Sequence, residues 1–147
     1  MSKDPAPMPL VAAYLSFDGR CAEAMAFYER TLGARLQTLL RFADTPMGAG
    51  MAPEAARLVM HAYLVLPDGS VIMAGDAPAG MPFEGMKGFG MALNFATPAA
   101  ARGVFDAFAE GGTVQMPMQP TFWAQSFGMV TDRYGTPWLV NGGPIPV

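Results

Sequence analysis

The feature of this sequence that most constrains its fold is an internal repeat. An offset of 78 positions brings matching residue types together along the two halves of the 147-residue chain. Repetition at one fixed offset is typical of a chain built from copies of one supersecondary unit. We therefore expect two tandem copies of a single unit. The matched pairs are Leu15 with Leu93, Phe17 with Phe95, Ala22 with Ala100, Phe27 with Phe105, Gly33 with Gly111 and Gln37 with Gln115.

The first copy reads as one strand, one helix and three further strands. An apolar segment at 10–17 ends at Asp18-Gly19, which is typical of a strand followed by a turn. Gly33 has the residue type that commonly closes a helix, and the apolar face before it consists of Cys21, Met25, Tyr28 and Leu32. Further strands are expected at 34–42, 58–66 and 70–74, with a mobile loop at 44–53 that is too rich in proline and glycine for regular structure.

The second copy repeats this order. A linker at 77–88, rich in glycine and proline, precedes an apolar strand at 89–95. Thr97-Pro98 has the residue types of a helix N-cap followed by proline at the first helical position, and Gly111-Gly112 ends that helix. Three more strands are expected at 113–118, 125–131 and 138–141.

Together these elements predict an α+β fold made of two tandem βαβββ units. The chain is expected to form a single domain over 1–147, with the first unit at 9–76, a linker at 77–88 and the second unit at 89–147. A sheet that carries one helix must cover its second face. We therefore expect a curved mixed or antiparallel sheet around a cavity. The periodicity leaves open whether the units pair within one chain or across two chains.

The composition is that of a compact globular protein, with 52% hydrophobic and 14% charged residues. The net charge of −3, without a cluster of Lys or Arg, argues against a nucleic-acid partner. The longest apolar run, 10–15, is far shorter than the roughly 20 residues that cross a membrane. The first residues lack the plan of a secretion signal, so we expect a cytoplasmic protein without membrane contact.

The single cysteine, Cys21, is expected to be a small buried side chain.

Several segments of the chain form recognisable motifs: residues 14–24, 27–28, 33, 61–62, 73–76, 122–123, 127–135 and 138–141. These segments resemble the PhnB-like branch of the vicinal oxygen chelate superfamily, which includes glyoxalases, bleomycin-resistance proteins and extradiol dioxygenases. It implies the glyoxalase/bleomycin-resistance fold, usually as a homodimer, around a funnel that binds a small molecule. We therefore expect a small-molecule ligand and a second copy of this chain as the partners.

In the metal-dependent branches of this superfamily, His, Gln or Glu side chains from the first and last strands of each unit hold one divalent ion. The position that corresponds to the last-strand glutamate is Leu139, and the first-strand positions fall near 11–13 and 90–91. None of these residues offers a nitrogen or carboxylate ligand, and the chain has one histidine. We therefore expect no metal site of the family type and no cofactor.

His61 and Asp76 are the candidate catalytic residues. A histidine that faces the cavity could act as a general base near neutral pH, with Asp76, at the end of the paired strand, as its orienting partner. The alternative is a lone histidine hydrogen-bonded into the sheet. We favour that alternative, because a catalytic histidine needs both a partner and a cleft.

Polar and aromatic residues in otherwise apolar segments are the candidate ligand-binding residues, because a few orienting groups in an apolar cavity are typical of small-molecule sites. They are Tyr14, Ser16, Asn94, Trp123, Phe127 and Asn141. Their alternative role is ordinary packing and hydrogen bonding within the sheet, and Trp138 is assigned to the core.

Two functions from different classes fit the sequence. The first is a protein that binds a small molecule without catalysis. The second is an enzyme of lyase, isomerase or dioxygenase type that uses an atypical metal or base centred on His61. A methyltransferase label, which some proteins of this branch carry, has no support, because Gly48-Ala49-Gly50 lies in an irregular loop rather than on a turn between strand and helix.

Overall fold

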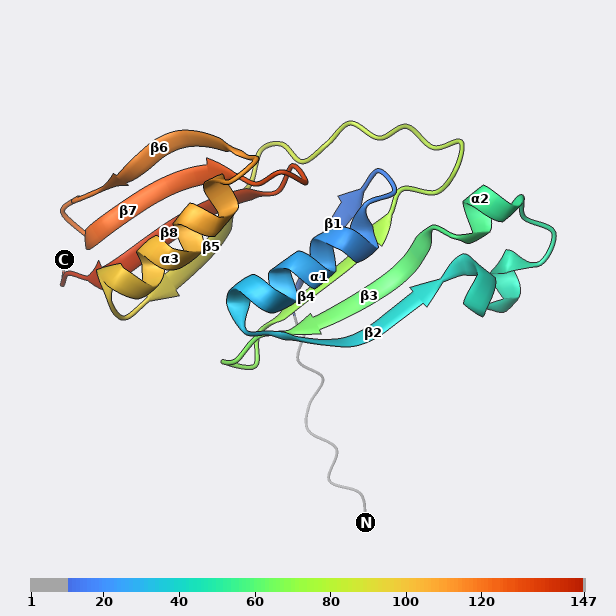
Figure 1. The fold of residues 1–147 in the computed structure, drawn as a ribbon, viewed down its shortest axis with the longest axis horizontal. Coiled ribbons are helices and arrows are strands. Elements are labelled where there is room, and N and C mark those ends of the chain that lie inside the picture. Colours follow the sequence, from blue (N-terminus) through green and yellow to red (C-terminus); the bar gives the residue numbers. More distant parts are fainter. Residues whose placement is uncertain (1–10, 147) are drawn as a thin grey trace, which may run out of the picture.

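The computed structural model describes residues 11–146, which form two four-stranded sheets with one long helix on each (Figure 1). The first unit contains β1 (Ala13–Phe17), α1 (Cys21–Leu32), β2 (Arg35–Arg41), β3 (Val59–Val65) and β4 (Val71–Asp76). The second unit contains β5 (Met91–Phe95), α3 (Pro98–Ala109), β6 (Thr113–Gln119), β7 (Ala124–Thr131) and β8 (Pro137–Pro144). The predicted α+β class and the tandem βαβββ order are confirmed.

The two sheets have the same topology. Their strand orders are β1-β4-β3-β2 and β5-β8-β7-β6. In each sheet the first strand runs parallel to the last, and the other neighbours are antiparallel. The internal repeat in the sequence is therefore a repeat of topology, and each sheet is mixed.

The segment between β2 and β3 is more regular than its composition indicated. It contains two short 3-10 helices, Phe42–Asp44 and Pro46–Gly48, and the short helix α2 (Pro53–Ala56). The Thr45 hydroxyl caps the second of these by accepting a hydrogen bond from the Met47 amide at 3.2 Å. The expectation of a loop without regular structure is wrong here, because proline fits the first position of a helical turn and needs no amide there.

The ends of the long helices follow the sequence signals. Gly33 ends α1 in the left-handed conformation, with a φ of 64°. At the start of α3 the Thr97 hydroxyl accepts a hydrogen bond from the Ala100 amide at 3.2 Å. These local signals work because the backbone groups at helix ends have no partner within the helix. None of the helices within residues 11–146 combines the length and the apolar character that spanning a membrane requires.

The two units contact each other through their helices. Both α1 and α3 lie on the side of the sheets that faces the viewer in Figure 1. Phe27 and Tyr28 of α1 pack against Phe108 of α3, with ring centroids 5.9 and 6.2 Å apart. Trp138, which is 1% exposed, stacks on the same Phe108 ring at 4.5 Å. No strand pairing joins the two sheets within residues 11–146. The units are thus joined through one apolar core rather than by a continuous sheet.

Candidate functional site

Each sheet has one face away from its helix, which we call the open face. Alternation along the strands decides which side chains lie there. Leu15 and Phe17 of β1 are buried towards α1, so Tyr14 and Ser16 lie on the open face of the first sheet. In the second sheet the open face carries Asn94, Phe127, Leu139 and Asn141. The six candidate ligand-binding residues therefore lie on or beside the open faces, divided between the two sheets.

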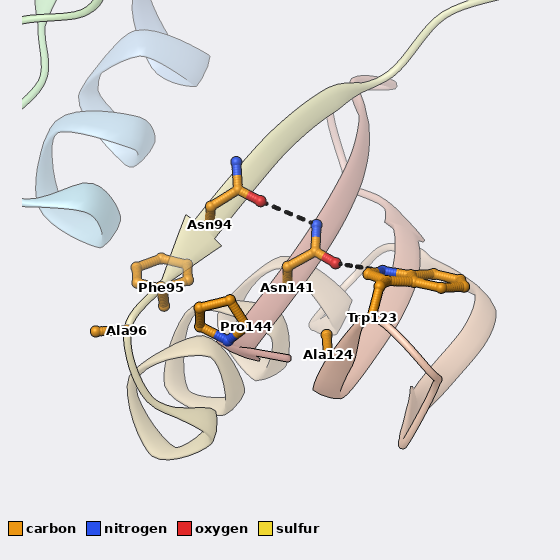
Figure 2. A pocket seen from close by; sticks show the side chains of 7 residues that line it. All are labelled: Asn94, Phe95, Ala96, Trp123, Ala124, Asn141 and Pro144. Carbon is orange, nitrogen blue, oxygen red and sulfur yellow. Dashed lines mark hydrogen bonds between the residues drawn. The ribbon is translucent and has the colours of Figure 1, made fainter. Parts of the chain in front are cut away.

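Three of the candidates form one hydrogen-bonded row at the end of the second sheet (Figure 2). The Trp123 indole Nε1 donates to Asn141 Oδ1 at 3.0 Å, and Asn141 Nδ2 donates to Asn94 Oδ1 at 3.1 Å. β5 and β8 run parallel with Asn94 beside Asn141, so the sheet register sets this spacing. Trp123 comes from the loop before β7. We call these three residues the amide row.

The amide row lines a cavity of about 320 Å³. The other lining residues are Phe95, Ala96, Ala124 and Pro144. Small side chains at Ala96 and Ala124 leave the space open, and nothing in the sequence pattern had marked them. Such a cavity, mostly apolar with a few polar groups at one wall, can hold a small organic molecule.

An aromatic cluster adjoins this cavity. Trp123 contacts Phe127 and Phe122 through roughly perpendicular rings, with centroids 5.2 and 4.9 Å apart. Trp123 is 39% exposed and Phe122 is 76% exposed, whereas Trp138 is fully in the core. The two tryptophans thus differ in their surroundings: Trp123 lies at the surface and Trp138 lies in the core.

A second, larger cavity of about 850 Å³ lies between the two units. It is bordered by the edge strands β1 and β5 and by the turn between β3 and β4. Asn94 and Phe95 line both cavities, so the two spaces meet at the end of β5. The residues of the first unit that line it, such as Leu66 and Ser70, were not singled out in the sequence.

Tyr14 and His61 form an aromatic pair on the open face of the first sheet. Their rings stack with centroids 6.0 Å apart, and Tyr63 lies 6.4 Å from His61. The Tyr14 hydroxyl donates to the Met60 carbonyl at 3.1 Å. It crosses Gly75, where an added Cβ would lie 2.9 Å from both of these oxygen atoms. Partial burial is the main factor that raises the pKa of Tyr14, so the phenol stays neutral and serves as a donor.

Asp76 is not a partner of His61, and this catalytic pairing is wrong. The Asp76 carboxylate points to the helix side of the sheet, where it accepts hydrogen bonds from the amides of Gly19, Cys21 and Val59 at 2.9–3.0 Å. His61 lies on the opposite face, beside Tyr14 and Tyr63. Strand alternation separates the two side chains, and Asp76 instead caps the start of α1.

Cys21 is fully buried at the start of α1. Burial, followed by repulsion from the Asp76 carboxylate, raises the pKa of its thiol to about 12. A thiol in this state is not a nucleophile at neutral pH, because the reactive species is the thiolate. The structure therefore places Cys21 in the core, as its position on the apolar helix face indicated.

The positions at which the family resemblance implies metal ligands carry no side chain that suits a metal ion. Leu139 leans over Gly90, so closely that an added Cβ at Gly90 would overlap the leucine side chain. The neighbouring Met91 packs towards the core, and Val11 is 97% exposed. Within residues 11–146 no three His, Cys, Asp or Glu side chains converge in a way that could hold a metal ion. These apolar residues provide no oxygen or nitrogen side-chain ligand.

These features define a class of protein: a chain of two tandem βαβββ units whose open sheet faces carry a small, mostly apolar cavity. The sequence matches the profile of the Glyoxalase/Bleomycin resistance protein/Dioxygenase superfamily over residues 11–140. The chain belongs to this superfamily. The superfamily that the sequence segments resemble is thereby confirmed.

Two relatives are similar over nearly their whole lengths. Protein YjdN of Escherichia coli strain K12 is 36% identical over 144 residues, which cover 91% of this chain and 95% of that protein. The crystal structure of protein PA1353 from Pseudomonas aeruginosa is 43% identical with a TM-score of 0.83, and the match covers 91% of this chain and 97% of that one.

A PhnB protein from Bacillus cereus, also named a 3-demethylubiquinone-9 3-methyltransferase, is more distant. Its TM-score is 0.75 at 23% identity, with 89% of this chain and 97% of that chain covered. At this identity the likeness shows the fold alone. The methyltransferase name therefore stays with that protein.

Proposed function

We propose that this protein binds a small, largely apolar molecule in the cavity beside the amide row and does not transform it. The observation that carries the proposal is the hydrogen-bonded row Trp123–Asn141–Asn94 on the wall of an otherwise apolar cavity. Apolar walls supply affinity, and a few fixed polar groups supply orientation. The lining residues include no acid, base or nucleophile that would drive a reaction.

The alternative, an enzyme centred on His61, has less support. His61 lies among Tyr14, Tyr63 and Met73 on the first sheet, and its expected partner Asp76 is bonded to three amides on the other side. A general base needs a group that orients it and a site where the substrate can sit against it. Within residues 11–146 no hydrogen-bond partner fixes the imidazole.

Binding is tested by NMR on the ¹⁵N-labelled full chain with three probes of similar size: acetophenone, aniline and benzoate. The chain has two tryptophans, so its indole N–H region holds two signals. We expect probe binding to shift the Trp123 signal and to leave that of buried Trp138 in place. If none of the three probes moves the Trp123 signal at millimolar concentration, the proposed binding site is refuted.

Metal analysis with a His61→Ala variant separates binding from catalysis. The binding function predicts no stoichiometric metal in the purified protein and unchanged probe affinity in the variant. Stoichiometric metal that is lost in His61→Ala would contradict this function and favour the enzyme. Asn141→Leu is the matched positive control, because it removes the centre of the amide row and should weaken probe binding.

The proposed biological unit is a homodimer. On the open face of the first sheet, Tyr14 is 51% exposed and Leu40 is 37% exposed, beside His61 and Tyr63. A broad apolar sheet face is usually covered by another layer. A second copy of this chain would cover it. Light scattering at micromolar concentration should give twice the chain mass of 15.6 kDa, and a monomer mass would contradict the proposal.

A further inference from the structure

The amide row has a fixed direction. The Trp123 indole Nε1–H can only donate, so the group that faces it must be the Asn141 oxygen. The Asn141 nitrogen then faces Asn94, and it must find an oxygen there. The donor-only indole therefore sets the orientation of two amides that could otherwise turn over freely.

The row ends in an unused donor. Because Asn94 Oδ1 accepts from Asn141, the Asn94 Nδ2 points away from the row, as Figure 2 shows. This nitrogen has no hydrogen-bond partner within residues 11–146. Asn94 is solvent-exposed and is among the residues that line both cavities, so its free amide nitrogen is open to a ligand where the two spaces meet. A ligand that meets this end of the row must offer an acceptor.

The surroundings disfavour charge on that ligand. All seven residues that line the smaller cavity are uncharged. The larger cavity adds the carboxylate of Asp68, which repels an anion. The whole chain carries a net charge of −3. A carboxylate or phosphonate that entered would lose water without gaining a positive partner, which is costly in an apolar setting.

From these three observations we infer the ligand class: an uncharged aromatic or similarly flat molecule with a ketone, amide or comparable oxygen that accepts a hydrogen bond from Asn94 Nδ2. In this arrangement the oxygen meets Asn94 Nδ2 at the end of the row, and the flat apolar part lies along the uncharged wall of the adjoining cavity. This inference rests on the proposed binding function and specifies its chemistry.

The test compares the affinities of the same three probes in the NMR titration. Acetophenone is a neutral acceptor, aniline is chiefly a donor and benzoate is an anion. We expect acetophenone to bind about 3- to 10-fold more tightly than either of the others, the ratio that one ordinary hydrogen bond supplies. Equal affinities, or tighter binding of aniline or benzoate, would overturn the ligand class while leaving the binding function intact. Absence of any binding would overturn both.

Two variants test the direction of the row. Asn94→Asp keeps the acceptor for Asn141 but replaces the free donor by an acceptor, so the preference should change from acetophenone to aniline. Gln119→Glu adds the same charge at an exposed residue outside both cavities and should keep the wild-type order. Trp123→Phe removes the donor that fixes the orientation of both amides. In this variant acetophenone and aniline should therefore bind with nearly equal affinity. The backbone amide shifts of residues 94–96 measure the two affinities, because the Trp123 indole signal is absent.

The Trp138 indole signal reports whether each variant is folded, because this indole donates to buried Asp132 at 2.7 Å. If Asn94→Asp retains the wild-type preference for acetophenone in a folded protein, Asn94 is not the donor and the inference fails. The same conclusion follows if Gln119→Glu changes the preference as much as Asn94→Asp does.

Discussion

The Tyr28 hydroxyl donates a hydrogen bond of 2.7 Å to Asp132 Oδ2, and this bond joins the helix of the first unit to the β7–β8 turn of the second. Asp132 is buried and also accepts from the Trp138 indole and from the amides of Tyr134 and Thr136. A buried carboxylate is tolerated when its oxygens are satisfied by donors in this way. The Asp132 side chain thus holds the two units in one arrangement around α1 and α3.

Removing this link should destabilise the whole chain. Tyr28→Phe deletes the donor to a buried carboxylate, so we expect the free energy of unfolding to fall by about 1–3 kcal/mol. Asp132→Asn should cost at least as much, because its amide nitrogen would face other donors. Urea unfolding measures both. Tyr63→Phe is the matched control, since no partner of the Tyr63 hydroxyl lies within residues 11–146. A loss of equal size in the control would contradict the prediction.

Gly142 allows α3 to approach the second sheet. An added Cβ there would lie 2.6 Å from Ala101 Cβ and 2.9 Å from the Thr97 carbonyl oxygen. Gly142→Ala therefore forces the helix away, and we expect a cost of about 1–3 kcal/mol in thermal or urea unfolding. Gly103→Ala, in the middle of α3 with open space around it, should instead stabilise by about 0.5–1 kcal/mol. Similar effects of the two substitutions would show that this close approach is unimportant.

Cys21 should make the stability depend on alkaline pH. The pKa of the folded thiol is raised to about 12, whereas an unfolded thiol ionises near roughly 8.5. Between these values the unfolded chain loses a proton that the folded chain keeps, so stability falls as the pH rises. We expect a loss of about 1–2 kcal/mol between about pH 7 and 10, and a smaller loss in Cys21→Ala.

Urea unfolding at each pH measures this difference. Burial also raises the pKa of Tyr28, so some loss above roughly pH 10 should remain in the variant. Iodoacetamide gives an independent check: the native thiol should resist alkylation at pH 8 and react after unfolding. Rapid labelling of the native protein would contradict the buried, protonated state.

Leu139→Glu tests whether a single carboxylate at this position would be enough to give the chain a metal site. The variant restores a carboxylate at the matching position, but Gly90 and Met91 still provide no side-chain ligand. We expect no stoichiometric Mn²⁺ binding in isothermal titration calorimetry. Leu139→Gln is the control for the change in size and polarity. Tight one-to-one binding in the glutamate variant alone would show that the remaining ligands are already present.

Much of the fold was predictable because it depends on local signals. Gly33 and Thr97 mark helix ends through their own backbone or side-chain chemistry, and apolar alternation marks the strands. The segment at 44–53 was not predictable in the same way. Its glycines and prolines are compatible with both irregular loops and single helical turns, and Thr45 decides between them by capping.

The three residues of the amide row were recognisable in the sequence as candidates, but their hydrogen-bonded grouping was not. Trp123, Asn94 and Asn141 were each recognisable as polar or aromatic residues in apolar surroundings, yet 47 positions separate the two asparagines in the chain. Only the parallel pairing of β5 with β8 brings those two amides together. The predicted pairing of His61 with Asp76 was incorrect because it did not take the two sheet faces into account. These residues belong to adjacent strands, but their side chains lie on opposite faces of the sheet.

The sequence by itself determined the repeated unit, the helix ends and the superfamily, since each depends on residue type or short-range order. Tertiary structure alone decided which face of each sheet stays open, that Asp132 joins the two units, and that Leu139 packs over Gly90. The physical reason is that strand register and helix packing are set by contacts between residues far apart in the chain, and no local pattern encodes such contacts.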